Sequence, residues 1–525
     1  MVKLRPDTLN WVLQHALRHG DTDIFPLSFE FRAIQQDWDR IRANLTDQNV
    51  LDWQTRPPRD CLAPKGSHAF RIVTQLDPLD FLLFTGLLYE IGAHIEARRV
   101  ASARNIVFSH RFAPSADGRM FDAAIGYRQF INECNQKLTQ PHVSYVAVAD
   151  IADFYPRLYH HPLENALLSA TTHTAHVSAI MRLLAGWTGR VSYGIPVGSD
   201  PARLLAEITI SDVDEALLSA GIEFVRFSDD YRFFTNTRSE AYRKIAFLAN
   251  YLYYNHGLTL QPQKTEIMAA DDFQRRFLRT FEERELDNIR NSFEIFAEEL
   301  GLDTWYEPIE YDDLTPEQKE FIDSLNLVEM VREELDGDGG PDFAVVSFAL
   351  RRMGQLGSPE LVDDVLTNIE QLHPIFPDLI RYLGRIRGLG EIERAGIGGR
   401  VLDLVEHSIV SELEYHRMWA FQLFAQSREW GNGDRVFRLL AAAPDPLTRR
   451  KIILGMGRSR QVHWFQMRRR HLFEESPWPR RAVLAAASCM PTDAYRHWYR
   501  SIEARLDILE QAVISWARQN PFHAN

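Results

Sequence analysis

Cysteine is scarce in this sequence. Its 525 residues include only Cys61, Cys134 and Cys489, and none of them belongs to a C-x-x-C pair. Single cysteines at such wide spacing argue against both a disulfide framework and a cysteine-based zinc site. We therefore expect three buried, reduced thiols.

Long apolar runs and low-complexity tracts are also missing. No stretch approaches eighteen apolar residues, and the first residues lack the apolar core of a signal peptide. The composition, 45% hydrophobic and 25% charged, is that of a globular protein. At this length we expect two or more domains in a soluble, cytoplasmic protein with no membrane partner.

Positive charge is nearly absent from one segment and concentrated in another. Residues 294–342 contain 17 acidic residues and only two basic ones, Lys319 and Arg332. Residues 444–505 contain 13 basic and five acidic residues. The net charge of −13 therefore does not exclude a nucleic-acid enzyme, because it averages an acidic segment with a basic one.

Two strand-like segments carry carboxylates where a strand ends. One is Val146–Asp150, and the other is a hairpin over residues 223–235 with Ser228, Asp229 and Asp230 at its turn. Aspartates that are distant in sequence and adjacent in space are what two-metal phosphoryl transfer requires. The pattern predicts nucleotidyl transfer.

The segments around these aspartates alternate between strands and helices. Such an order is typical of an α+β fold, in which helices cover an antiparallel sheet. The predicted strands are 143–150, the two arms of the hairpin 223–235, and 258–260; the predicted helices are 78–99, 162–185, 201–220 and 239–255.

Beyond residue 270 the strand signal disappears. Asp336–Pro341 is the strongest linker signature of the chain, and helices punctuated by Gly, Pro and Asp follow it. About ten such helices in succession indicate an α-solenoid of helix pairs.

Four motifs occur in a fixed order in the strand-bearing part of the chain. They are Asp150-Ile151-Ala152-Asp153-Phe154-Tyr155, Gly194-Ile195-Pro196-Val197-Gly198, Phe227-Ser228-Asp229-Asp230, and Gly257-Leu258-Thr259-Leu260 followed by Lys264-Thr265. Each alone is weak, since a strand-end aspartate often only caps the next helix. The ordered set resembles palm motifs A, B, C and D of reverse transcriptases.

The resemblance implies a metal site. Asp150 and the Ile151 carbonyl match the motif A ligands, Asp229 matches the first carboxylate of motif C, and Asp230 matches its supporting neighbour. Oxygen ligands favour Mg²⁺, or Mn²⁺, over zinc. Lys264 matches the motif D lysine, a proton donor to pyrophosphate, although an exposed lysine after a strand is otherwise unremarkable.

The resemblance also implies a deoxynucleotide pocket. Tyr155 matches the aromatic residue that faces the sugar 2′ position, with a core aromatic as the alternative interpretation. Arg71 is a candidate to clamp the triphosphate, or else a solvated strand residue. Val197 and Gly198 belong to motif B, where templated enzymes usually carry Gln at the position of Val197. A valine side chain cannot form hydrogen bonds, so template-directed synthesis is in doubt.

Further features are similar to the bacterial abortive-infection (AbiK-like) polymerases, a group of defence-associated reverse transcriptases. They are Phe108-Ser109-His110-Arg111-Phe112, Met120-Phe121 and the helical C-terminus with Pro477–Leu484 and Trp498-Tyr499-Arg500. The resemblance implies reverse-transcriptase-like fingers and palm in 1–285, an acidic connecting segment in 286–340, and a HEAT-like helical-repeat domain in 341–525.

Membership would imply an antiphage enzyme that makes single-stranded DNA from dNTPs, protein-primed and without a template, as a homo-oligomer such as a trimer or hexamer. Tyr89, Tyr127 and Tyr159 are candidate primers, since no tyrosine precedes Tyr89. The basic residues of 444–505 could guide the product strand, or form a solvated helix face.

Two other functions remain open. The same palm could copy a bound noncoding RNA, as a templated reverse transcriptase does. Alternatively, the palm could be a non-catalytic scaffold for the helical-repeat module, although all three aspartates are present. An RNA polymerase is disfavoured, because Tyr155 leaves no room for the 2′ hydroxyl.

Overall fold

Four antiparallel strands form the sheet that carries the predicted carboxylates. They are β3 (Tyr145–Asp150), β4 (Val225–Phe227), β5 (Asp230–Thr235) and β6 (Glu266–Ala269). Their order across the sheet is β4-β5-β3-β6. In this register Asp150, the last residue of β3, lies opposite Asp230, the first residue of β5. The two acidic strand ends therefore meet at the same end of the sheet.

Helices cover both faces of this sheet and form the N-terminal part of the same unit. They are α1 (Pro6–His19), α2 (Glu30–Gln36), α3 (Trp38–Asp47), α4 (Pro78–Arg98), α5 (Tyr127–Leu138), α6 (Phe154–Arg157), α7 (His160–Ala170), α8 (Thr174–Thr188), α9 (Asp200–Thr209), α10 (Ser211–Ser219), α11 (Arg238–His256) and α12 (Ala270–Phe277).

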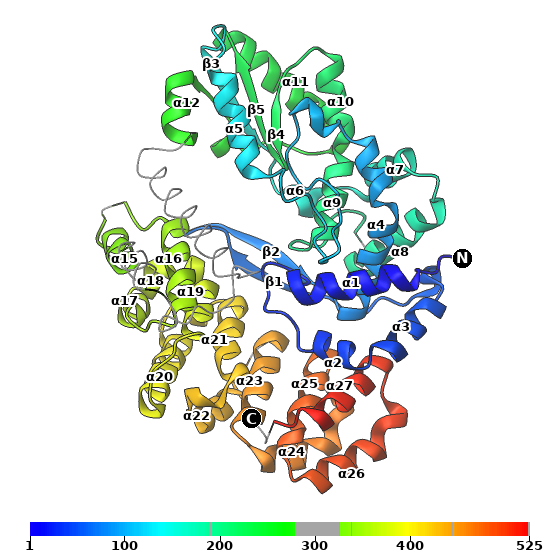
Figure 1. Ribbon diagram of the computed structural model, residues 1–525, viewed down its shortest axis with the longest axis vertical. Coiled ribbons are helices and arrows are strands. Elements are labelled where there is room, and N and C mark those ends of the chain that lie inside the picture. The colour runs from blue at the N-terminus through cyan, green and yellow to red at the C-terminus, as the bar shows by residue number, and fades with distance from the viewer. Residues whose placement is uncertain (190, 279–314, 316–325, 338, 444, 523–525) are drawn as a thin grey trace. The chain divides into compact units, whose positions relative to one another are not determined.

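Successive residues of β3 point to opposite faces of the sheet, which gives each face its own core. Val146 and Val148 pack with Phe130 of α5 and Phe273 of α12. Helix α11 packs against β3, β5 and β6, and Figure 1 shows it beside the sheet, away from α5. Burial on both faces fixes the register, because a slip of one residue would exchange the two cores.

A second group of helices forms the C-terminal part of the chain. They are α15 (Leu327–Asp336), α16 (Phe343–Leu356), α17 (Val362–Thr367), α18 (Ile369–Leu372), α19 (Phe376–Leu383), α20 (Glu391–His407), α21 (Glu414–Gln426), α22 (Gly433–Leu439), α23 (Pro446–Arg458), α24 (Val462–Arg468), α25 (Pro477–Ala486), α26 (Thr492–Ile502) and α27 (Ile508–Gln519).

Six of these helices pack one after another along the chain. Helix α16 packs on α19, α19 on α21, α21 on α23, α23 on α25, and α25 on α27. The approach is close: a Cβ on Gly457 of α23 would lie 2.6 Å from the Ala486 Cβ of α25. Successive packing of this kind is the arrangement that a solenoid of helix pairs predicts. The helical C-terminal region is confirmed, and its assignment to HEAT-like repeats stays a prediction.

The computed structural model describes residues 1–189, 191–278, 315, 326–337, 339–443 and 445–522. The chain divides into two compact units, Met1–Asp60 with Ile72–Glu282, and Cys61–Arg71 with Glu283–Asn525. We call them the palm unit and the helical unit. Most of the predicted acidic segment 286–340 lies outside the described residues. Among the described residues, no helix is long and apolar enough to cross a membrane.

The strand predicted at 258–260 is wrong in extent. Only a single bridge forms there, between Ile151 and Leu260. The next strand of the sheet is instead β6, which the sequence analysis missed. The helices predicted at 162–185 and 201–220 each divide into two, at residues 171–173 and at Ile210. A short antiparallel pair, β1 (Arg59–Pro64) and β2 (Phe70–Gln75), precedes α4.

Candidate active site

The end of β3 and the turn of the hairpin are joined by backbone hydrogen bonds. The Ile151 N–H donates to the Asp229 carbonyl over 3.1 Å. On the other side of β3, the Gln261 N–H donates to the Asp150 carbonyl over 2.8 Å. These bonds bring the segments of motifs A, C and D together at one end of the sheet.

Lys264 forms an ion pair with the motif A aspartate. Its Nζ lies 2.8 Å from Asp150 Oδ2. Burial alone lowers the pKa of Lys264, but the hydrogen bond and charge of Asp150, followed by the charges of Asp230 and Asp229, outweigh burial and raise it. The ammonium is therefore held protonated by its contact with Asp150, and the charges of Asp230 and Asp229 act on it in the same direction.

The third carboxylate is engaged differently. Asp230 Oδ1 accepts from Arg232 Nη1 over 3.3 Å. With Asp150 paired to Lys264 and Asp230 to Arg232, no three Asp, Glu, His or Cys side chains of the described residues converge closely enough to hold a metal ion. The hard oxygen donors nevertheless fit Mg²⁺ or Mn²⁺ chemically, and Lys264 shows that the site attracts a cation.

Tyr155 lies beside the hairpin turn. Its hydroxyl interacts with the Ser228 side chain. Burial raises the pKa of Tyr155, with the charge of Arg203 acting in the opposite direction. The phenol is therefore neutral, and it lies within electrostatic reach of Asp229. Tyr155 therefore lies close to the predicted aspartates, and its role at the sugar stays a prediction.

The predicted motif B turn lies against the N-terminal segment of the palm unit. Gly198 has φ of +110°, and a Cβ there would come within 2.7 Å of Ile24 Cδ1 and Thr22 Oγ1. Its position therefore requires glycine for both conformation and space. Val197 offers its carbonyl to the Thr74 N–H over 3.4 Å. These contacts hold the turn in place against the N-terminal segment.

Arg71 belongs to a different unit from the predicted aspartates. It is exposed in β2, and its residue group 61–71 belongs to the helical unit, where its charge acts on Tyr415. The other eight predicted site residues, namely Asp150, Ile151, Tyr155, Val197, Gly198, Asp229, Asp230 and Lys264, all belong to the palm unit.

The sequence analysis missed Arg203 on α9. Its guanidinium donates to Asp200 and Asp23, and its charge acts on Tyr155. Burial alone lowers the pKa of Arg203, and the charges of Asp23 and Asp200 more than reverse that effect. An arginine one turn into the helix that Gly198 precedes was the available signal.

A second missed group lies beneath the hairpin. Arg226 of β4 is fully buried and contacts the carboxylates of Glu207 and Asp214. Ser109, from the Phe108–Phe112 motif, hydrogen-bonds both Glu207 and the Ser228 N–H. The only sequence signal was an arginine inside an otherwise apolar strand.

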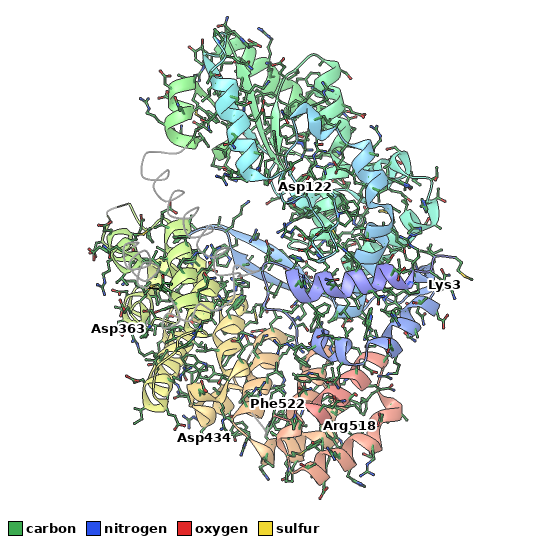
Figure 2. All side chains as sticks on the ribbon, in the orientation of Figure 1. Lys3, Asp122, Asp363, Asp434, Arg518 and Phe522 are labelled. Carbon is green, nitrogen blue, oxygen red and sulfur yellow. The ribbon has the colours of Figure 1, made fainter. Side chains whose placement is uncertain are left out.

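The basic residues of 444–505 are largely used inside the helical unit. Arg450, Lys451 and Arg481 are buried, and so are Phe465 and Trp478. Three further arginines of the run form ion pairs, namely Arg449 and Arg468 with Glu475 and Arg480 with Glu510. Near the C-terminus, Arg458 stacks over the Phe522 ring, which Figure 2 labels. Most of the run therefore supports packing.

Comparison with protein families gives one match over the region that carries the site. Residues 107–311 match the family described as reverse transcriptase (RNA-dependent DNA polymerase), of which residues 279–311 lie outside the described part of the chain. Over these residues the chain is similar to a reverse transcriptase domain, and the match supports a reverse-transcriptase-like nucleotidyltransferase. A search of curated proteins finds no match.

Among solved structures the chain is similar to telomerases. Telomerase from Candida albicans in complex with a fragment of telomeric RNA has 13% identity and a TM-score of 0.28, over 76% of this chain and 68% of that one. The corresponding Candida tropicalis complex has 12% identity and a TM-score of 0.32, over 66% and 65%. Apo telomerase from Candida tropicalis has 9% identity and a TM-score of 0.29, over 81% and 74%.

Proposed function

We propose that this protein is a DNA polymerase that joins dNTPs by two-metal nucleotidyl transfer. One observation carries the proposal: Asp150 lies opposite Asp230 in the sheet, with Asp229 at the adjoining turn and the Lys264 ammonium paired to Asp150. Three carboxylates that meet at one end of a sheet are suited to holding divalent metal ions.

The roles follow from chemistry and position. Asp150, Asp229 and the Ile151 carbonyl would hold the metal ions, and Asp230 would support Asp229. When bound, Mg²⁺ or Mn²⁺ would supply activation of the attacking hydroxyl and charge neutralisation at the pyrophosphate. Lys264, which is paired to Asp150, donates a proton to pyrophosphate in this proposal.

Tyr155 and the motif B turn define the nucleotide pocket in this proposal. Tyr155 blocks the 2′ position and so selects dNTPs over NTPs. Val197 and Gly198 border the pocket from the other side, and Arg203, which Asp23 and Asp200 hold in place, acts on Tyr155 through its charge. Arg71 keeps its proposed role as a triphosphate clamp only as an expectation from the family resemblance.

The finer proposal is a phage-defence polymerase that is protein-primed and independent of a template, and that works as a homo-oligomer. Val197 supports template independence, since it offers the template no side-chain hydrogen bond. Of the candidate primers, Tyr89 stacks on Trp11 and Tyr159 contacts Tyr193. Tyr127 is 51% exposed and meets Phe227 of the hairpin edge-on at 5.3 Å, so we propose Tyr127 as the first primer to test.

The test is synthesis by the purified full chain with dNTPs and Mg²⁺, without added nucleic acid. We expect DNA covalently attached to the protein, absent from Asp229→Ala, with Tyr127→Phe losing attachment. Mass spectrometry identifies the attached residue, and sequencing reads the product. Free DNA that complements one co-purifying RNA, abolished by RNase, would replace this proposal with a templated reverse transcriptase. Phage protection that survives Asp229→Ala would favour a scaffold.

A further inference from the structure

The residue before the proposed metal ligand Asp229 has an unusual backbone. Ser228 has φ of +54°, in the left-handed region that residues other than glycine rarely adopt. Such a conformation persists only where the surroundings hold it in place. Two buried side chains do so here, one at each backbone polar group of Ser228.

Ser109 holds the amide of Ser228. The Ser228 N–H donates to Ser109 Oγ over 2.9 Å, and Ser109 Oγ donates to Glu207 Oε1 over 2.5 Å. Ser109 is fully buried, and Glu207 is 1% exposed. A serine hydroxyl has one donor and can accept as well, so this arrangement uses the hydroxyl in both directions.

Arg226 holds the carbonyl of Ser228. Arg226 Nη1 donates to the Ser228 carbonyl over 2.9 Å, and the same nitrogen lies 3.1 Å from Glu207 Oε2. Arg226 also donates to both carboxylate oxygens of Asp214 over 2.9 and 2.6 Å. The guanidinium is therefore fixed by two carboxylates while it holds the turn.

Glu207 connects the two contacts. Burial alone raises its pKa, but the charges of Arg226 and Arg99 outweigh burial and hold the pKa at about 2. Its carboxylate is therefore an acceptor only. The Ser109 hydroxyl must donate to it, which leaves the lone pairs of Ser109 for the Ser228 N–H.

We propose that Ser109, oriented by Glu207, is a positioning residue that holds the turn before Asp229 in its left-handed conformation. This inference rests on the proposed function for its catalytic consequence, because Asp229 must face the metal ions for nucleotidyl transfer. Partners that orient a metal ligand typically contribute about 10- to 100-fold to metal affinity or activity. Ser109 acts through Asp229 and does not itself touch the reacting atoms.

The first measurement is amide hydrogen exchange over the hairpin in the full chain without nucleotide or metal. Ser109→Ala removes one hydrogen bond to the Ser228 amide, and we expect this amide to exchange about tenfold faster. The matched control is Ser211→Ala. Ser211 is also buried, and its hydroxyl donates to the Ile208 carbonyl over 2.8 Å, within the palm unit. Unchanged exchange at Ser228 in Ser109→Ala would overturn the proposal.

The second measurement is nucleotide incorporation as a function of Mg²⁺ concentration. We expect Ser109→Ala to raise the Mg²⁺ concentration for half-maximal rate about tenfold, and Ser211→Ala to leave it unchanged. Adding Ser228→Gly to Ser109→Ala should restore much of the loss, because glycine adopts the left-handed conformation without steric cost. An unchanged Mg²⁺ dependence in Ser109→Ala, or the same shift in Ser211→Ala, would contradict the proposed positioning.

The two measurements separate this inference from the proposed function. Hydrogen exchange reports on the Ser109 contact whether or not the protein makes DNA. One result is a wild-type protein that incorporates no dNTP, while the Ser228 amide exchanges faster in Ser109→Ala. That result would refute the proposed polymerase and support the positioning role of Ser109. The opposite result is DNA synthesis by wild type, with unchanged Ser228 exchange and unchanged Mg²⁺ dependence in Ser109→Ala. It would support the polymerase and refute the positioning role of Ser109.

Discussion

The palm unit and the helical unit both bury arginines, and carboxylates are prominent partners of those in the palm unit. There Arg226 contacts the carboxylates of Glu207 and Asp214 and lies over the Tyr231 ring, and Arg99 contacts Glu207. In the helical unit buried arginines lie over aromatic rings: Arg450 and Arg481 have their guanidinium carbons 5.2 and 4.4 Å from the centre of the Trp478 ring.

The difference matters because the two partners fix an arginine to different degrees. A carboxylate binds a guanidinium in the plane of its fork and sets its orientation. A ring attracts the cation across a broad face with less directional control. In the palm unit, buried charge therefore fixes the turn next to three aspartates. In the helical unit, buried charge contributes to the packing between helices.

The largest expected effect is on the rate of dNTP incorporation, and it compares one carboxylate from each unit. Asp229→Asn removes a proposed metal ligand, and loss of several kcal/mol of metal stabilisation lowers the rate by about 10³-fold or more. Asp363→Asn in the helical unit, where the carboxylate is 89% exposed and pairs with Arg400, should leave the rate unchanged. Single-turnover dNTP incorporation measures both. If Asp229→Asn were as active as wild type, Asp229 would contribute no more to function than Asp363 does.

The next effect concerns stability and compares two buried arginines directly. Arg226→Met leaves Asp214 buried without its cation and Glu207 with Arg99 alone, which costs about 3–5 kcal/mol. Arg450→Met loses the hydrogen bond to the Trp478 carbonyl, 2.9 Å long, and the ring contact, a loss of about 1–3 kcal/mol. Urea unfolding of each variant gives both free energies. A cost for Arg450→Met that equals that of Arg226→Met would show that ring and carboxylate partners are equivalent here.

Sequence analysis places the proposed catalytic carboxylates at the strand ends where the structure has them, because their signal is local. Asp150 ends an apolar strand, and Asp229 and Asp230 follow another, so alternation and the turn predict both positions. It fails for Ser109 and Glu207, whose contacts join residues that are distant in the chain and have no periodic signature. Buried polar contacts of this kind arise from tertiary packing, which one sequence does not display.

The errors in the elements have a similar origin. Helix 201–220 divides at Ile210, where the hydroxyls of Thr209 and Ser211 hydrogen-bond the carbonyls of Leu205 and Ile208. Such side chains compete with the helical backbone for hydrogen-bond partners. The apolar pattern of the sequence does not show whether the helix continues or ends there. β6 was missed because four residues are too few for a clear alternation.

A third prediction concerns Asp80, a buried carboxyl of the palm unit that is held by neutral N–H groups. Asp80 accepts from the indole N–H groups of Trp53 and Trp187 and from the Arg56 N–H. Burial, together with the charge of Asp77, raises its pKa to about 7 despite these hydrogen bonds. The folded state therefore binds this proton more tightly than the unfolded state does. The stability contributed by Asp80 is fully present below pH 4 and is lost as the pH rises to 7.

The expected magnitude follows from the size of that shift. Each pH unit between about 4 and 7 should remove up to about 1.4 kcal/mol of stability in wild type. Asp80→Asn lacks this dependence, so its unfolding free energy should approach or pass that of wild type as the pH rises. Thermal unfolding between pH 4 and 8 compares the two. Parallel curves would show that Asp80 is already ionised at pH 4.

The smallest effect is expected for the exposed arginines of the helical unit. Most of the basic run is engaged in ion pairs and ring contacts, which leaves residues such as the half-buried Arg469 and the exposed Arg470 for a ligand. Replacing both with Ala should change stability by less than about 0.5 kcal/mol, and should weaken binding of single-stranded DNA by less than about threefold. Fluorescence anisotropy at several salt concentrations measures that affinity. A tenfold loss, with the salt dependence reduced by about two phosphate contacts, would mean that this unit guides the DNA product and that its charges have a function beyond packing.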